Sequence, residues 1–287
     1  MMRRKHGTQV VTLALCAAIA ACQKIEEPKP GAPVLVAFDV IDPSGAVMPL
    51  VADGGQVLVP PRAHVLARFD RLLDGARLES VTDAGVTGKP GVAIITATGQ
   101  PQAAISYIPN GDANFGLLFP PGPQLIVTPI PTFPAGTTIT VTLDKTLIVS
   151  KRGEGPYQPA PGVADGLTFT TAPFAAAITA GDGAPGDGGL PQLAANAPVT
   201  IVFNNLPEAA IASRFMVVVT DATGQPLANA AAPPAASEMD PATWVVLPTG
   251  GAWPAGARVS VSVDAAAQDA LGMPITAAAT NTFAVSP

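Results

Sequence analysis

Hydrophobic residues in this chain fall into short runs separated by proline and glycine. The runs are about four to eight residues long and rich in Val, Ile and Thr, which is typical of strands in an all-β sandwich or barrel. Helical periodicity is nearly absent, and only 209–214 and 265–270 suggest one helical turn each. We therefore predict an all-β fold with strands at 34–40, 64–69, 125–128, 138–143, 199–203, 215–219, 244–247 and 258–263.

The two halves of the chain repeat one another. The pentapeptide Ala-Thr-Gly-Gln-Pro stands at 97–101 and recurs unchanged at 222–226. Phe133-Pro-Ala-Gly136 opens an alternating strand, and Trp253-Pro-Ala-Gly256 opens another. Two further matches keep the same order, 65–70 with 199–204 and 167–170 with 281–284. Four matches in one order indicate an internal duplication of one domain, with shorter loops in the second copy.

The repeated motifs suit turns and strands. In Phe133–Leu143, proline and glycine favour a tight turn, after which Ile, Val and Leu share one face of a strand and threonines share the other. In the pentapeptide we expect a positive φ at glycine and a hairpin at a sheet edge. Asp144 and Asp264 end matched strands, where a carboxylate commonly accepts hydrogen bonds from a turn.

This order of strand, Pro-Ala-Gly turn, alternating strand and closing Thr-Phe strand resembles the bacterial Ig-like domain of the type named after the surface-layer protein SbsA. In that family an Asp followed shortly by Gly comes after the alternating strand, and Asp269-Ala-Leu-Gly272 fits this pattern. The first copy departs from it with a longer, charged and proline-rich insert at 145–161. The resemblance implies two Ig-like β-sandwiches in tandem and a surface or scaffold role, with no family active site.

The N-terminus reads as an export signal. A basic head, Arg3-Arg4-Lys5, precedes an apolar run at 10–21 that is shorter than the roughly 20 residues of a spanning helix. Ile19-Ala-Ala-Cys22 resembles the lipobox of bacterial lipoproteins, which implies lipid on the thiol and the amino group of Cys22. The alternative is an ordinary secretory signal that is cut elsewhere.

The lipoprotein interpretation divides the chain into four parts. They are a signal peptide at 1–21, a lipidated tether at 22–31, and Ig-like sandwiches at 32–172 and 173–287. By analogy with Gram-negative lipoproteins, Gln23 in place of Asp predicts sorting to the outer membrane, facing the periplasm or the cell surface. The joint near Ala172-Pro173 leaves little slack, so we expect a stiff rod.

Charge and cysteine content exclude several classes of partner. Residues 1–21 contain three basic and no acidic residues, so the rest of the chain has 12 basic against 21 acidic residues, a net charge near −9. Such a surface repels nucleic acid. After processing only Cys22 remains, so no disulfide is expected within the chain.

The sequence contains no catalytic constellation. His64 is the single histidine after processing and no Gly-x-Ser-x-Gly turn is present, so a Ser-His-Asp triad is not expected. We interpret His64 as a surface or edge residue. No His or Cys pairs stand at zinc spacing, and no Gly-rich phosphate loop follows a strand. We therefore expect no enzyme, no catalytic residue, no metal and no cofactor.

Three places are weaker candidates for binding. Lys151-Arg152, in the first-copy insert, is either a solvated loop or a contact for an acidic group of a partner. Asp182 and Asp187 lie in a glycine-rich loop, where a solvated loop is favoured over a calcium site. Trp253 could stack on a sugar, but Phe133 at the matched position favours a role in the core.

These observations predict an envelope lipoprotein, anchored at Cys22, that acts as a non-enzymatic structural, adhesion or assembly module. The alternative is a ligand-binding surface lipoprotein that takes an envelope protein or a polysaccharide at the 145–161 loop.

Overall fold

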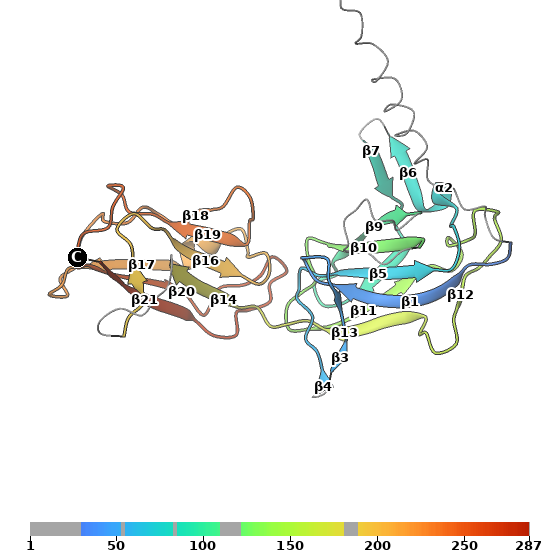
Figure 1. Cartoon of the computed structure of the whole chain (residues 1–287), viewed down its shortest axis with the longest axis horizontal. Helices are drawn as coiled ribbons and strands as arrows, with labels where there is room; N and C mark the ends of the chain where they lie inside the picture. Colours follow the sequence, from blue (N-terminus) through green and yellow to red (C-terminus); the bar gives the residue numbers. More distant parts are fainter. Residues whose placement is uncertain (1–29, 53–54, 83–84, 110–121, 181–188, 287) are drawn as a thin grey trace, which may run out of the picture.

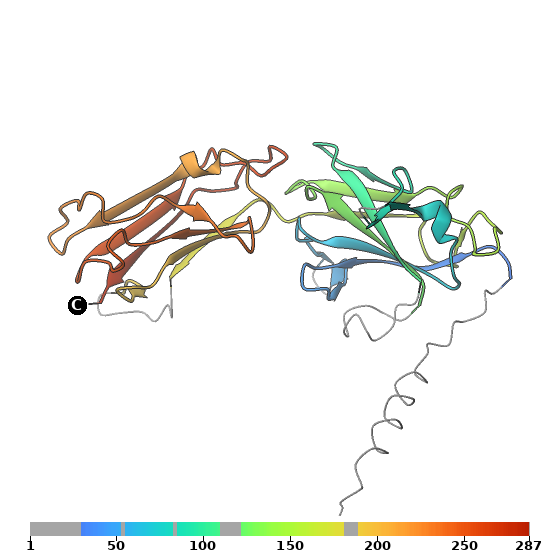
Figure 2. The ribbon, with the colours of Figure 1, turned by 90° about the horizontal axis from the view of Figure 1, so that it is seen from above.

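The structure, a computed structural model, describes residues 30–52, 55–82, 85–109, 122–180 and 189–286. Two bodies of strands lie in series along the long axis and are joined by a short segment (Figures 1 and 2). The fold is an all-β sandwich, as the alternating apolar runs predict. Among the described residues no helix is long and apolar enough to cross a membrane.

The first body contains two sheets. One has the order β1 (Val34–Ile41), β5 (His64–Phe69), β10 (Gln124–Ile130), β9 (Gln102–Ile108), with β12 (Gln158–Pro159) and β2 (Val47–Met48) added at β1. The other has the order β13 (Gly166–Thr170), β11 (Thr138–Leu143), β8 (Ala93–Thr96). All these pairings are antiparallel except that of β12 with β1.

The second body repeats this arrangement. One sheet has the order β14 (Ala176–Ala180), β16 (Val199–Phe203), β19 (Thr243–Val246), β18 (Ala235–Ala236). The other has the order β15 (Gln192–Leu193), β21 (Ala279–Val285), β20 (Arg258–Val263), β17 (Phe215–Thr220). Each body has seven matched strands, which we letter A to G in chain order. They are β1, β5, β8, β9, β10, β11 and β13 in the first body, and β14, β16, β17, β18, β19, β20 and β21 in the second. In both bodies the two sheets then have the orders A-B-E-D and G-F-C. This is the strand order of a constant-type immunoglobulin sandwich.

Buried side chains form two clusters, one in each body. The first runs from Leu35 to Phe169, and the second from Phe174 to Val285 with the addition of Ala135. In β11 the apolar residues are buried and the threonines are exposed or partly exposed, which confirms the predicted alternation. The boundary expected at 172/173 falls between the clusters, and the domain limits themselves stay a prediction.

The repeated pentapeptides have the expected positive φ, 76° at Gly99 and 86° at Gly224. The hairpin prediction is wrong for the first copy, because 97–101 connects β8 of one sheet to β9 of the other. In the second copy the chain does reverse on itself, and Thr220 bridges to Pro226 before the chain crosses to β18. The crossing follows from the fold, since strands C and D belong to different sheets.

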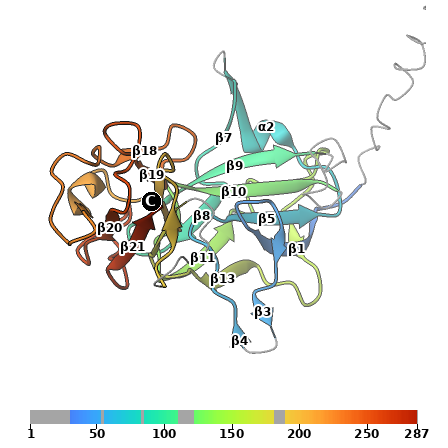
Figure 3. The same ribbon diagram turned by 60° about the vertical axis from the view of Figure 1, so that its left-hand side comes forward.

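Smaller elements lie outside the two sandwiches. The hairpins β3–β4 (Val51–Ala52, Gly55–Gln56) and β6–β7 (Glu79–Thr82, Gly85–Gly88) project from opposite sides of the first body (Figure 3). The short helix α2 (Gly75–Leu78) lies at the end of the first body away from the second (Figure 1). Of the predicted turn at 209–214, only η2 (Ile211–Arg214) forms, as a 3-10 turn, whereas 265–270 form no helix, contrary to expectation.

Candidate functional site

Several predicted site residues lie outside the described residues. These are Cys22, together with Asp182 and Asp187 of the glycine-rich loop. Lipid attachment and the calcium alternative therefore stay predictions. Within the described ranges, no three His, Cys, Asp or Glu side chains gather closely enough to hold a metal ion.

His64 is not an edge residue. It opens β5, which pairs with β1 on one side and β10 on the other. The side chain is partly buried, and its Nδ1 lies 3.1 Å from Oγ1 of Thr128. Burial lowers the pKa of His64, so the neutral ring is favoured at neutral pH.

Phe133 and Trp253 are both buried, with exposed fractions of 0% and 2%. Their backbone amides make matched hydrogen bonds, Phe133 N to Pro61 O and Trp253 N to Ala195 O. The Trp253 indole also donates from Nε1 to Ala197 O at 2.7 Å. The core role is confirmed, and neither ring has a free face for a sugar.

Lys151 and Arg152 are both exposed, at the tip of a turn. The base of the 145–161 insert is packed into the first core, with Ile148 and Tyr157 fully buried, so only the tip is a solvated loop. Lys145 forms an ion pair with Asp165, and its ammonium group lies over the ring of Tyr157. These contacts hold the base of the insert against the first core.

This turn has an equivalent in the second body. Lys151 N donates to Leu72 O at 2.9 Å, and Ala270 N donates to Leu206 O at 2.8 Å. Glycine N closes each turn onto the carbonyl three residues earlier, at Ser150 in the first body and Asp269 in the second. The first copy thus keeps the Asp-x-x-Gly turn of the second copy, with Ser150 in place of Asp269.

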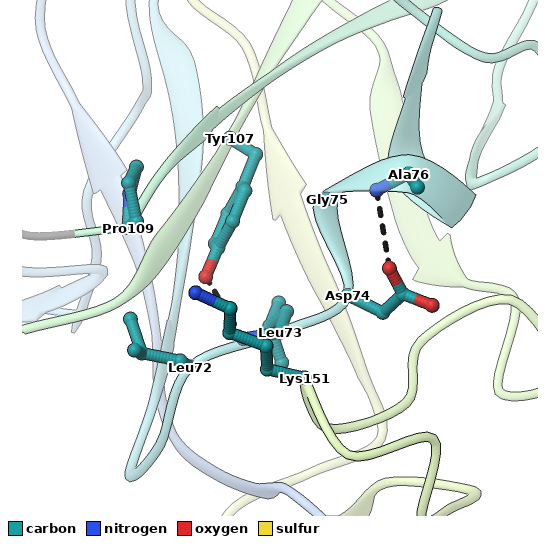
Figure 4. Close-up of a pocket in the computed structure, with 8 residues that line it drawn as sticks. All are labelled: Leu72, Leu73, Asp74, Gly75, Ala76, Tyr107, Pro109 and Lys151. Carbon is teal, nitrogen blue, oxygen red and sulfur yellow. Dashed lines mark hydrogen bonds between the residues drawn. The ribbon is translucent and has the colours of Figure 1, made fainter. Parts of the chain in front are cut away.

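The tip of the first-body turn borders a pocket of about 410 Å³ at the end away from the second body (Figure 4). Segments after β5, at the end of β9 and in the insert form its lining. The lining residues are Leu72, Leu73, Asp74, Gly75, Ala76, Tyr107, Pro109 and Lys151. Arg152 is not among them, so the structure separates the two basic residues that the sequence pairs.

Two donors face this pocket. The Tyr107 hydroxyl oxygen accepts a hydrogen bond from Leu73 N at 2.8 Å, which leaves its own hydrogen to donate. Burial raises the pKa of Tyr107 to about 12, so the hydroxyl stays protonated. In Figure 4 the ends of Lys151 and Tyr107 point to the same part of the pocket. Sequence reasoning missed Tyr107, which lies in a strand that it did not predict.

Asp74 is the acidic group of the pocket. One carboxylate oxygen accepts from Ala76 N at 3.2 Å, and the other lies 3.5 Å from Arg77 Nε. The Asp74 carboxylate is therefore already engaged by its own segment, whereas Lys151 forms no ion pair with any residue that the structure describes.

The equivalent end of the second body is occupied by the first body. Asp269 is buried, with an exposed fraction of 1%. Its Oδ2 accepts from Ala135 N of the first body at 3.1 Å and from Asn205 Nδ2 at 2.9 Å. Asn205 Nδ2 also lies 3.1 Å from Phe133 O, the second acceptor for this amide group. We call Ala135, Asn205 and Asp269 the joint network.

Two outer contacts accompany the joint network. Arg62 of the first body pairs with Asp240 of the second at 3.0 Å. Burial alone would raise the pKa of Asp240, but hydrogen bonds from Arg62 and from Ala242 N lower it overall. Leu271 lies so close to Gly99 that an added Cβ there would stand 3.3 Å from the leucine Cβ.

No protein-family model matches this chain, and neither does any curated protein. Among solved structures, the N-terminal part of the bacterial S-layer protein SbsC is similar at 14% identity and a TM-score of 0.26, covering 89% of this chain and 44% of that one. The titin A168169 structure is similar at 12% identity and a TM-score of 0.24, covering 89% and 98%. The chain thus spans less than half of the S-layer structure. The sandwich assignment rests on the strand pairings above.

Proposed function

We propose that this chain is an envelope lipoprotein in which lipid on Cys22 anchors two Ig-like sandwiches held in one fixed orientation. It acts as a non-enzymatic structural, adhesion or assembly module. The lipobox at 19–22 and the resemblance to the SbsA-type Ig-like domain support the location and the role.

The observation that carries the structural role is the joint network. Two domains that move freely share few buried contacts, and relative motion is the usual expectation for linked domains. Here a carboxylate, an amide and a backbone N–H are buried together between the two bodies. A rotation that broke these hydrogen bonds while the groups stayed buried would cost about 1–3 kcal/mol for each unsatisfied group. A rod of constant length suits a spacer or a scaffold better than it suits a catalyst.

Metabolic labelling with palmitate tests the anchor. The wild-type chain is expected to take up label and to fractionate with membranes, and Cys22→Ser is expected to lose both properties. Cys16→Ser is the matched control, because Cys16 lies within the apolar run that processing would remove. Label in Cys22→Ser, or no label in the wild type, would refute the lipoprotein assignment.

Sorting between membranes provides a second test in a Gram-negative host. Gln23→Asp is expected to move the labelled protein from the outer to the inner membrane without changing its acylation. A labelled wild-type protein that is found only in the inner membrane would contradict the outer-membrane location while leaving the anchor intact.

A further inference from the structure

The equivalent ends of the two sandwiches have different surroundings. In the second body this end receives the Phe133–Ala135 segment of the first body. In the first body the equivalent end contains the pocket bordered by Lys151 and Tyr107. The matched hydrogen bonds of Lys151 and Ala270 to Leu72 and Leu206 establish that the two ends correspond.

The two ends offer different groups to an occupant. In the second body Asp269 accepts from Ala135 N and Asn205 Nδ2 donates to Phe133 O, so the occupant supplies one backbone N–H and one backbone C=O. In the first body Ser150 replaces Asp269, and the Lys151 ammonium and the Tyr107 hydroxyl are the donors at the pocket. The Asp74 carboxylate of the same pocket already contacts Ala76 N and Arg77. An occupant that meets Lys151 and Tyr107 must therefore supply acceptors.

The rest of the pocket limits the occupant further. Its walls include Leu72, Leu73 and Pro109, so part of the occupant must be apolar. A volume of about 410 Å³ lies at the small end of the usual range for ligand pockets. Asp74 places a negative charge at the same site, which disfavours a doubly charged phosphate more than a singly charged carboxylate.

We propose that this pocket binds a small carboxylic acid with an apolar body, whose two carboxylate oxygens accept from Lys151 Nζ and from the Tyr107 hydroxyl. The apolar part lies against Leu72, Leu73 and Pro109. This site goes beyond the anchoring and spacing role proposed above and does not depend on it.

Isothermal titration with octanoate tests the site, using the full chain with Cys22→Ser to prevent acylation. We expect saturable binding of one octanoate per chain. Lys151→Gln should weaken it about fivefold, the upper range for a partly exposed ion pair. Tyr107→Phe should weaken it to a similar extent by removing one hydrogen bond. Circular dichroism checks that each variant is folded.

Arg152→Gln is the matched control, because it removes the same charge from the neighbouring position and Arg152 does not line the pocket. It should change the affinity less than twofold. Octylamine should not bind, and octyl phosphate should bind more weakly than octanoate. An equal effect of Lys151→Gln and Arg152→Gln, tight binding of octylamine, or no octanoate binding by the folded wild type would overturn the proposal.

Discussion

The two sandwiches share seven matched strands, and their equivalent ends make different contacts. In the second sandwich that end is closed by the joint network, and in the first it is an open pocket next to an exposed basic tip. The turn that defines this end is the same in both, with Ser150 in one and Asp269 in the other. A duplicated fold can therefore keep its core and its turns while the polar residues at one end, such as Ser150 and Asp269, differ between the copies.

The largest effects are expected from the matched core aromatics. Phe133→Ala and Trp253→Ala each remove a buried ring and should destabilise their own half by about 3–5 kcal/mol. Both tryptophans, Trp244 and Trp253, lie in the second half, so tryptophan fluorescence reports on that half alone. Circular dichroism reports on both.

In Phe133→Ala the dichroism transition should split, while the fluorescence transition stays near its wild-type midpoint. In Trp253→Ala the remaining Trp244 should report an earlier transition. If either substitution melted both halves together, the two sandwiches would be one cooperative unit rather than two copies of a domain.

The joint network provides the second comparison. Asp269→Ala removes the acceptor of Ala135 N and one of the two acceptors of Asn205 Nδ2, so we expect a loss of about 1–3 kcal/mol in urea unfolding followed by fluorescence. The same variant also removes the acceptor of the turn amides Leu271 N and Met273 N. Ser150→Ala removes one acceptor at the matched position, the partner of Glu154 N, and should cost about 0.5–1.5 kcal/mol in the first half only. Equal costs for the two variants would mean that the joint adds nothing to the turn.

The repeated pentapeptides give a smaller, matched test. Gly99→Ala and Gly224→Ala each place a side chain at positive φ, at about 1 kcal/mol. The added Cβ meets Leu271 across the joint at Gly99 and meets nothing within 4 Å at Gly224. Gly224→Ala should lower the midpoint of the second half alone, through its own strained φ. Gly99→Ala should lower the midpoint of the first half through its strained φ and that of the second half through Leu271, as circular dichroism and fluorescence report in urea unfolding. A fluorescence midpoint that Gly99→Ala leaves unchanged would contradict the contact at the joint.

The smallest effect concerns pH. Because burial lowers the pKa of His64, the unfolded chain binds a proton below about pH 6.5 while the folded chain does not. The stability that this residue contributes is present above pH 6.5 and is lost as the pH falls toward the folded pKa. Between pH 7 and 5.5 the thermal midpoint of the first half should fall, and His64→Gln should remove that dependence. Pro198 precedes the matched strand of the second half and does not titrate. A pH dependence confined to the second half would contradict this assignment.

The repeated motifs made much of the fold predictable. Strands such as β5, β11, β16 and β20 combine alternation with flanking turn formers, so local sequence was sufficient for them. Strand β9 was missed because Gln102–Ile108 alternates weakly, with Ala103 and Ala104 where a larger residue would mark the buried face. Because this strand was not predicted, residues 97–101 were wrongly predicted to form a hairpin.

The candidate sites were only partly predictable. Lys151 stood out as one of two basic residues in the insert, but nothing local placed Tyr107 beside it, because a contact between segments 44 residues apart depends on strand order. Asp269 was recognised as a turn residue from Asp269-Ala-Leu-Gly272. Its Oδ2, however, accepts a hydrogen bond from Ala135 N of the other body. Asn205, which donates to the same oxygen, follows β16 in a loop without a recognisable motif. The joint network could therefore not be predicted from the local sequence of either segment.

The distance between the two bodies tests the fixed joint most directly. The chain from residue 30 onward contains no cysteine, so spin labels can be attached through Val47→Cys and Ala236→Cys, at exposed positions in different bodies. Double electron–electron resonance should give one narrow distance peak that Ser150→Ala leaves unchanged and Asp269→Ala broadens. A broad distribution in the chain with Asp269 intact would contradict a fixed orientation of the two sandwiches.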